Sequence, residues 1–183
     1  KVAPLKDLAN VQIVEVDISD ASSLASKAVF DGVHAAFLTC GNFRGQVEAE
    51  KSFIDAAVAA GVKYLCKLGT IRSYTATDSP VEYGRFHGEI EAHLEKVAGG
   101  MKWTVLQRES NPQLLALRAS PAYPEMRLRI SLQVLCPNWF MSNHLADIWG
   151  TLPKNIIAYP LASEAKNAIV DPRDIGEIAA AMM

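Results

Sequence analysis

Short apolar segments alternate with longer amphipathic segments along much of the chain. Val11 to Asp17 reads V-Q-I-V-E-V-D, and this alternation of apolar and polar residues predicts a strand. Val33 to Cys40 is a nearly continuous apolar run, which is typical of a strand buried on both faces in a parallel sheet. Val62 to Leu68 and Trp103 to Leu106 are predicted as two further strands.

Helices are predicted between these strands. A first helix is expected from Ala21 to Phe30, with Asp20 as its cap, and a second from Gln46 to Ala60. A third is expected over Glu82 to Val97, where apolar residues recur at four-residue spacing. Strands that alternate with helices long enough to cross over predict an α/β fold, with a parallel sheet covered on both faces.

Ligands of such sheets bind beyond the carboxyl ends of the strands. The candidate residues are therefore those that follow each predicted strand. They are Asp17 and Ile18, the segment from Thr39 to Asn42, Gly69 and Thr70, and Pro137 and Asn138 after a strand near Leu135.

Composition excludes several functional classes. Hydrophobic residues make up 50% of the 183 residues, and the net charge of −2 does not favour nucleic acid, which is bound through clustered Lys and Arg. No stretch reaches the ~20 apolar residues of a membrane span, and the polar start does not resemble a signal peptide. Three cysteines without C-x-x-C spacing argue against zinc and indicate reduced thiols in a cytoplasmic protein, which could also be nuclear.

Six motifs occur in the order expected of one family. They are V-E-V-D-I-S-D at 14–20, A-A-F-L-T-C-G-N at 35–42, G-V-K-Y-L-C-K-L-G at 61–69, Y-G-R-F-H-G-E-I-E at 83–91, P-N-W-F-M-S-N-H at 137–144 and D-P-R-D-I-G-E-I-A at 171–179. Together they resemble the NmrA-like family of atypical short-chain dehydrogenases. The resemblance implies a single, partial NAD(P)-binding domain over residues 1–183, with a Rossmann-type doubly wound parallel sheet.

The chain departs from the family pattern at both ends. The first β-α-β unit of the family, with its glycine-rich turn, is absent, and the C-terminal segment ends early at Met183. The turn offers backbone N–H groups and a helix N-terminus to the pyrophosphate. Without it, tight dinucleotide binding by this chain alone is not expected.

The resemblance implies cofactor-binding roles for eight residues. These are Asp17 and Ile18 beside the adenine, Thr39, Gly41 and Asn42 beside the ribose, and Lys67, Pro137 and Asn138 toward the nicotinamide. Asp17 could instead cap the following turn, and Gly41 and Asn42 could form an ordinary turn. Lys67 sits in a buried pattern, so it needs a carboxylate, a carbonyl or a cofactor oxygen as partner.

Tyr83, His87 and Lys67 are the candidate catalytic residues. Typical family members carry Tyr-x-x-x-Lys where this chain has Tyr83 and His87. The family lysine lowers the pKa of the tyrosine, which a neutral histidine does poorly. Tyr83 and His87 share a helix face, so they could form an acid pair near a substrate or simply a satisfied structural pair.

Two functions follow from the resemblance. The first is an NAD(P)H-dependent oxidoreductase acting on a small-molecule substrate of carbonyl or quinone type, with NADP(H) preferred over NAD. The alternative is a non-catalytic, dinucleotide-sensing regulator that signals to a protein partner. A third reading is a product of a truncated gene that has neither function.

The segment from Val105 to Gln133 interrupts the family pattern. It contains three prolines and shows no periodicity, and such long loops are unusual in compact domains. V-L occurs on both sides, so removal of the segment joins Thr104 to V-L-C-P-N-W-F and restores the pattern. Valine codons begin with GT, the dinucleotide at which an intron begins, and glutamine can be encoded by CAG, a common intron end. We therefore interpret the segment as a retained intron, with a genuine inserted loop as the alternative.

Overall fold

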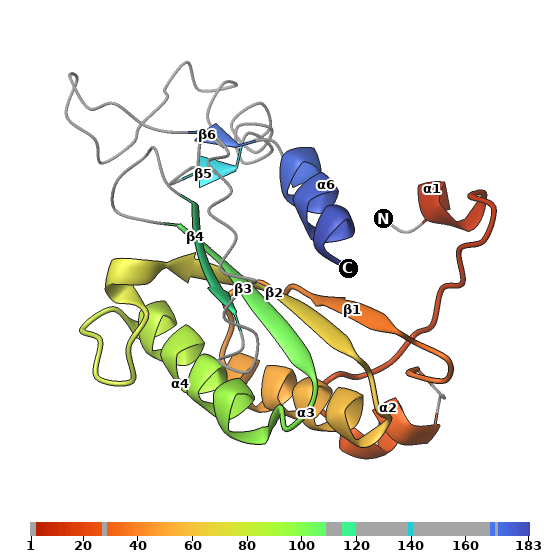
Figure 1. Ribbon diagram of the computed structural model, residues 1–183, viewed down its shortest axis with the longest axis horizontal. Helices are drawn as coiled ribbons and strands as arrows, with labels where there is room; N and C mark the ends of the chain where they lie inside the picture. Colours follow the sequence, from red (N-terminus) through yellow and green to blue (C-terminus); the bar gives the residue numbers. More distant parts are fainter. Residues whose placement is uncertain (1–2, 27–28, 109–114, 120–138, 141–168, 171) are drawn as a thin grey trace, which may run out of the picture.

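A four-stranded sheet forms the centre of the protein. The computed structural model describes residues 3–26, 29–108, 115–119, 139–140, 169–170 and 172–183. The strands β1 (Ala35–Leu38), β2 (Tyr64–Ile71) and β3 (Lys102–Arg108) are parallel, and β4 (Leu115–Ala119) pairs antiparallel with β3. The strand order is β1-β2-β3-β4 (Figure 1).

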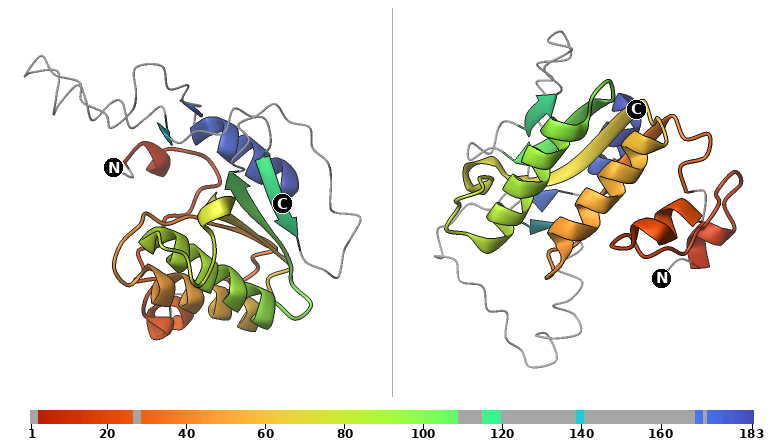
Figure 2. Two further views of the ribbon diagram at one scale, coloured as in Figure 1. Left: turned by 90° about the vertical axis from the view of Figure 1, so that its left-hand side faces the viewer. Right: turned by 90° about the horizontal axis from the view of Figure 1, so that it is seen from below.

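Helices cover both faces of this sheet. The long helices α3 (Gln46–Ala59) and α4 (Glu82–Val97) run side by side across one face, and α6 (Pro172–Met182) lies on the opposite face (Figures 1 and 2). The smaller elements are α1 (Ala3–Lys6), α2 (Ala21–Ser26), the 3-10 turn η1 (Arg72–Tyr74), and the parallel pair of β5 (Trp139–Phe140) and β6 (Ile169–Val170). The predicted α/β fold, with a parallel sheet between layers of helix, is confirmed.

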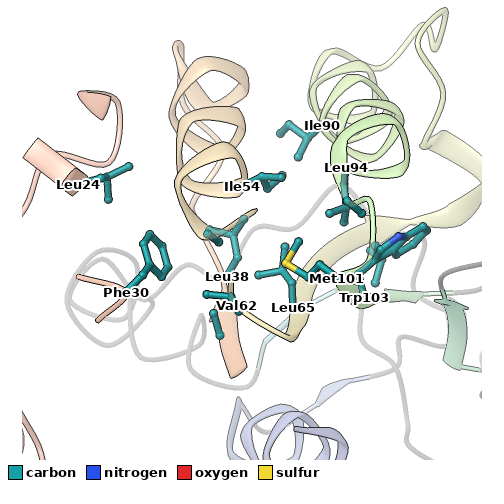
Figure 3. Close-up of a cluster of buried hydrophobic side chains, with 14 of the residues drawn as sticks. Leu24, Phe30, Leu38, Ile54, Val62, Leu65, Ile90, Leu94, Met101 and Trp103 are labelled. Carbon is teal, nitrogen blue, oxygen red and sulfur yellow. The ribbon is translucent and has the colours of Figure 1, made fainter. Parts of the chain in front are cut away.

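Apolar residues on alternating positions of the strands explain the two helical layers. On the α3 and α4 side, Ile54 and Leu94 point toward Leu65 of β2 and Trp103 of β3 (Figure 3). On the other side, a second buried cluster joins β2 and β3 to α6; its members are Tyr64, Cys66, Leu106, Ile175, Ile178 and Ala179. Each face of a strand thus has its own core, which is why the strands read as continuous apolar runs.

The strand predicted over Val11 to Asp17 is not formed. This stretch has no strand assignment, and residues 11–15 are exposed. An alternating segment becomes a strand only when a neighbouring strand completes its hydrogen-bond ladder. Within the described part of the chain, β1 pairs with β2 alone, so residues 11–17 have no strand beside them.

The other predicted elements match the structure closely. The helix α4 has the predicted limits, and α3 begins at the predicted residue and ends one residue early. Gly61 follows α3 with a φ of +77°, as expected of a glycine that stops a helix. The helix predicted to end at Phe30 is shorter, because Val29 and Phe30 lie in a turn.

The interrupting segment lies only partly within the described residues. Residues 105–108 continue β3, and 115–119 form β4, while 109–114 and 120–133 lie outside the described residues. The strand predicted near Leu135 also lies outside them. Within the described ranges, no helix has both the length and the apolar character needed to cross a membrane.

Candidate functional site

The carboxyl end of β1 meets the middle of β2 at one buried lysine. Leu38, the last residue of β1, pairs with Lys67 of β2. The chain then leaves the sheet through the segment from Thr39 to Asn42, where Thr39, Gly41 and Asn42 are exposed. A side chain added at Gly41 would meet nothing within 4 Å. This loop therefore leaves backbone accessible to a ligand at the edge of the sheet, directly after the position that pairs with Lys67.

Lys67 is fully buried and has three partners. Its Nζ lies 2.8 Å from Oε2 of Glu50, 2.9 Å from the carbonyl oxygen of Leu68 and 3.1 Å from Nδ1 of His87. An ammonium group has three protons and no lone pair, so Lys67 can only donate to these partners; its contact with Oε2 of Glu50 is an ion pair. The sequence predicted that this lysine needs a carboxylate or a carbonyl, and the structure supplies both.

The partners of Lys67 determine the protonation of His87. Because the ammonium can only donate, Nδ1 of His87 must accept, and the ring proton is placed on Nε2. Burial, reinforced by the charge of Lys67, lowers the pKa of His87 to about 3. His87 is therefore a neutral imidazole at pH 7.

Glu50 is a site residue that sequence analysis missed. Its side chain is 1% exposed, and its Oε1 accepts a hydrogen bond of 2.7 Å from Nε2 of Gln46, one turn earlier on α3. Gln46 and Glu50 share the four-residue spacing of the buried Ile54. This spacing places Glu50 on one stripe of α3 with Ile54, but it does not tell which stripe faces the sheet. Gln46, Glu50, Lys67 and His87 are called the polar cluster below.

A second buried pair lies on α4 and β3. Nε2 of Gln107 is 2.9 Å from both carboxylate oxygens of Glu91. Glu91 lies one turn after His87 on the same helix, and both side chains are buried. Buried polar side chains of α4 therefore contact the sheet at two places: His87 contacts Lys67 of β2, and Glu91 contacts Gln107 of β3.

Tyr83 has a different environment from that of His87. It is half-buried and packs edge-to-face against Tyr74, with 6.5 Å between the ring centroids. Among the described residues, no hydrogen bond joins Tyr83 to His87. The two candidate catalytic side chains are thus one helical turn apart, and each is held by its own neighbour.

Close packing holds the loop after β2 against the start of α4. A Cβ at Gly84 would overlap the carbonyl oxygen of Tyr74, and one at Gly88 would overlap the backbone of Ala76. In addition, Nη1 of Arg85 donates a hydrogen bond of 2.8 Å to the carbonyl oxygen of Ser79. This loop is therefore fixed beside the part of α4 that carries Tyr83 and His87.

The remaining predicted cofactor residues are placed as follows. Oδ1 of Asp17 accepts hydrogen bonds from the backbone N and Oγ of Ser19, at 2.9 and 2.6 Å, and these bonds lower the pKa of Asp17. Asp17 thus caps the turn, as its alternative reading proposed. Ile18 packs partly buried against the main core. Pro137 and Asn138 lie outside the described residues.

Two cysteines fall within the described residues, and both are free thiols. Burial raises the pKa of Cys66 to about 12. Burial also raises the pKa of Cys40, with a contribution from the carboxylate of Glu50, so Cys40 lies near the polar cluster. Within the described ranges, no three His, Cys, Asp or Glu side chains gather in a way that could hold a metal ion.

Comparison with protein families gives one match. Residues 3–67 match the NmrA-like family. The resemblance inferred from the motifs is therefore confirmed over this part of the chain. The motifs at 83–91, 137–144 and 171–179 lie outside the matched range. No curated protein matches the chain at a significant level.

Several solved structures are similar to part of the chain. The triphenylmethane reductase of Citrobacter sp., complexed with NADP(H), has 21% identity and a TM-score of 0.47 over 58% of this chain and 35% of its own. A dTDP-glucose 4,6-dehydratase from Streptomyces venezuelae, with NAD and DAU bound, has 20% identity and a TM-score of 0.48 over 58% of this chain and 40% of its own. A nucleoside-diphosphate-sugar epimerase from Staphylococcus aureus has 14% identity and a TM-score of 0.45, and 38% of that chain is covered. The match thus spans well under half the length of each of these proteins.

Proposed function

We propose that this chain is part of an NAD(P)H-dependent oxidoreductase whose dinucleotide lies along the carboxyl ends of β1 and β2. The observation that carries the proposal is the buried pair of Lys67 and His87, level with the end of β1. The accessible backbone at Gly41, next to that pair, is the kind of surface that a dinucleotide can approach closely. The match of residues 3–67 to the NmrA-like family supports the same assignment.

The proposed binding residues follow the edge of the sheet. Asp17 and Ile18 are assigned to the adenine, Thr39, Gly41 and Asn42 to the ribose, and Lys67, Pro137 and Asn138 to the nicotinamide end. The preference for NADP(H) over NAD rests on the family resemblance. The substrate is proposed to be a small molecule with a carbonyl or quinone group.

The nicotinamide, when bound, would supply a hydride to that group. His87 is neutral, so it can donate a hydrogen bond from Nε2 to an acceptor oxygen but is not a ready source of a proton at pH 7. The ammonium of Lys67 is fully buried against Glu50, the carbonyl of Leu68 and His87, so Lys67 acts through His87. Tyr83 is the remaining candidate proton donor. These features favour a quinone-type acceptor, which needs less acid catalysis than a ketone.

One observation favours the non-catalytic alternative. The pKa of His87 lies far below 7, so His87 does not change its protonation near neutral pH. A regulator that senses the dinucleotide and signals to a protein partner needs a binding site but no acid–base group. This alternative keeps the same binding residues and removes the reaction.

Binding and turnover can be measured in one sample. We would compare the chain as it stands with a version in which the first β-α-β unit of an NmrA-like protein precedes residue 3 and residues 105–133 are removed. NADPH binding is followed by fluorescence, and a quinone is then added while NADPH absorbance is recorded. The added glycine-rich turn should tighten binding, because it offers N–H groups to the pyrophosphate.

The outcomes separate the two functions. Binding followed by steady consumption of NADPH supports the oxidoreductase, and Tyr83→Phe should then slow turnover while Tyr74→Phe, on the exposed partner ring, serves as the control. Binding without consumption across several acceptors supports the regulator. Absence of binding by the version that carries the first β-α-β unit contradicts both.

A further inference from the structure

The ion pair between Glu50 and Lys67 is entirely removed from water. The side chains are 1% and 0% exposed, and Oε2 and Nζ are 2.8 Å apart. A buried ion pair often contributes little to stability compared with apolar side chains of the same volume, because both charges lose their hydration. This pair therefore calls for an explanation in terms of what it does to its neighbours.

In the polar cluster, Gln46 and Lys67 both direct donors at Glu50, and Lys67 also donates to His87. Nε2 of Gln46 donates to Oε1 of Glu50, which orients the carboxylate so that its Oε2 faces Lys67. Lys67 donates in turn to Nδ1 of His87. Since the ammonium cannot accept, a single tautomer of His87 satisfies the cluster, and its proton is on Nε2.

The Nε2–H of His87 is left as a donor. Among the described residues, no hydrogen bond to Nε2 of His87 is formed, although the side chain is only 4% exposed. With no acceptor in the described part of the chain, this N–H can donate to a ligand oxygen. His87 contacts Lys67, and Lys67 pairs with Leu38, the last residue of β1. This donor therefore lies near the edge of the sheet where the dinucleotide is proposed to bind.

We propose that Glu50 is a positioning residue that holds the Lys67 ammonium, which in turn fixes His87 as a neutral imidazole donating from Nε2 to a carbonyl-type oxygen of the ligand. His87 then serves as a hydrogen-bond donor and transfers no proton. The ligand's identity rests on the proposed function. The tautomer of His87 does not, since it follows from the contacts of the polar cluster alone.

The titratable groups around His87 come from four elements. They are Lys67 from β2, Glu50 from α3, Tyr83 and Glu91 from α4 itself, and Cys40 from the segment after β1. Glu50 is the carboxylate that is paired with Lys67, and Glu91 is hydrogen-bonded by Gln107. Removal of the charge on Glu50 therefore acts on His87 through Lys67.

The protonation of His87 can be read directly by NMR. The chain is labelled with ¹⁵N-histidine, and the ring nitrogen shifts of its four histidines are recorded without nucleotide between pH 5 and 8. His87→Gln identifies the signal of His87. We expect one neutral ring, protonated on Nε2 throughout this range, whereas an exposed histidine titrates near its ordinary pKa of about 6.5.

The variant Glu50→Gln tests the positioning role. It keeps the size of the side chain but removes the charge, so Lys67 loses its counter-charge and can become an amine that accepts from Nδ1–H. We expect a mixture of Nδ1- and Nε2-protonated rings at His87 in place of the single wild-type tautomer. Glu48→Gln, on the exposed face of the same helix, should leave the tautomer of His87 unchanged, and Glu50→Asp, which keeps the charge, should retain the wild-type tautomer.

Three results would overturn the proposal. The first is a wild-type His87 protonated on Nδ1, and the second is its titration between pH 5 and 8. The third is a folded Glu50→Gln protein with unchanged His87 shifts. The wild-type spectrum decides the tautomer even if Glu50→Gln does not fold. Because no nucleotide is present, a failure of NADPH binding leaves this test intact.

Discussion

His87 shows how single neighbours set the chemistry of a side chain. Burial disfavours the imidazolium, and the ammonium of Lys67 adds a like charge, so the pKa falls from 6.5 to about 3. In the unfolded chain the same histidine would titrate normally. Between pH 6.5 and 3 the unfolded state therefore binds more protons than the folded state, and stability is lost as the pH falls through this window.

Acid should destabilise the protein partly through His87. We expect His87→Gln to reduce the loss of unfolding free energy between pH 6.5 and 4, by up to about 1.4 kcal/mol per pH unit. Urea denaturation at several pH values measures this slope. His93→Gln, which alters a histidine paired with Asp55 at the surface, controls for the removal of a histidine elsewhere in the chain. Equal slopes in wild type and His87→Gln would contradict the lowered pKa.

For Lys67, the sequence predicted the kind of group that pairs with the buried ammonium but not the residue that provides it. A lysine in a buried strand pattern needs an acceptor, so a carboxylate or carbonyl near Lys67 could be expected. Glu50 could not be singled out, because Glu48 and Glu50 lie in the same polar stretch of one helix. Only the orientation of α3 against the sheet decides that Glu50 is inside and Glu48 outside.

Among the elements, α4 depends on two glycines for its place in the fold. Gly84 and Gly88 let the backbone of residues 74–77 approach the helix more closely than any side chain would allow. This contact fixes the loop that carries Tyr74. The spacing of apolar residues predicted the limits of α4, but it gave no sign that a loop packs on its glycine face.

Gly84→Ala should destabilise the protein. The added methyl group improves helix propensity by about 1 kcal/mol, but it overlaps the carbonyl of Tyr74, and overpacking costs typically ~1–3 kcal/mol. Gly176→Ala is the matched control, because Gly176 lies inside α6 with open space around its Cα. We expect denaturation to show a loss of stability for the first variant and a gain for the second. A gain for both would mean that the loop is not packed against α4.

The strand β3 bears on the proposed retained intron. Val105 and Leu106 are buried in the two cores, on opposite faces of the sheet. Removal of residues 105–133 would place Val134 and Leu135 at these two positions, with the same side chains. The third position would change from Gln107 to Cys136, and the hydrogen bonds from Gln107 to Glu91 would be lost.

The shortened chain should therefore fold, and one further substitution should stabilise it. We expect deletion of residues 105–133 to keep a cooperative unfolding transition. Cys136→Gln in that background should restore a donor to Glu91 and raise the unfolding free energy by about 1–3 kcal/mol. Thermal unfolding of both proteins gives the answer. A shortened chain without a cooperative transition would favour the inserted loop, and transcripts that all keep the segment would exclude the intron.

The segment from Val11 to Asp17 shows the limit of local pattern. Its alternation is as clear as that of any strand in the chain, yet it forms none. Strand formation depends on a neighbour that the pattern of the segment itself does not contain. Helices close their hydrogen bonds internally, which is why α3 and α4 were predicted more accurately than this strand.

For the whole molecule, the parallel sheet brings the candidate residues to one edge. Thr39, Gly41 and Asn42 follow β1, and the polar cluster joins β2 to the two long helices α3 and α4. The opposite edge holds Gly61, Lys63 and Gly99, which precede β2 and β3. Alternation of strand and helix was enough to predict this layout, because right-handed crossovers leave few other arrangements.

The most direct measurement is an NMR titration with NADPH of the ¹⁵N-labelled chain, preceded by the first β-α-β unit of an NmrA-like protein. If the dinucleotide lies along the carboxyl ends of β1 and β2, amide shifts should change at Asp17, Ile18, Thr39, Gly41 and Asn42. The amides of Gly61, Lys63 and Gly99 at the opposite edge should not move. Saturable changes confined to the first set would support the proposed site. Changes centred on the opposite edge, or no saturable change at any NADPH concentration up to millimolar, would contradict it.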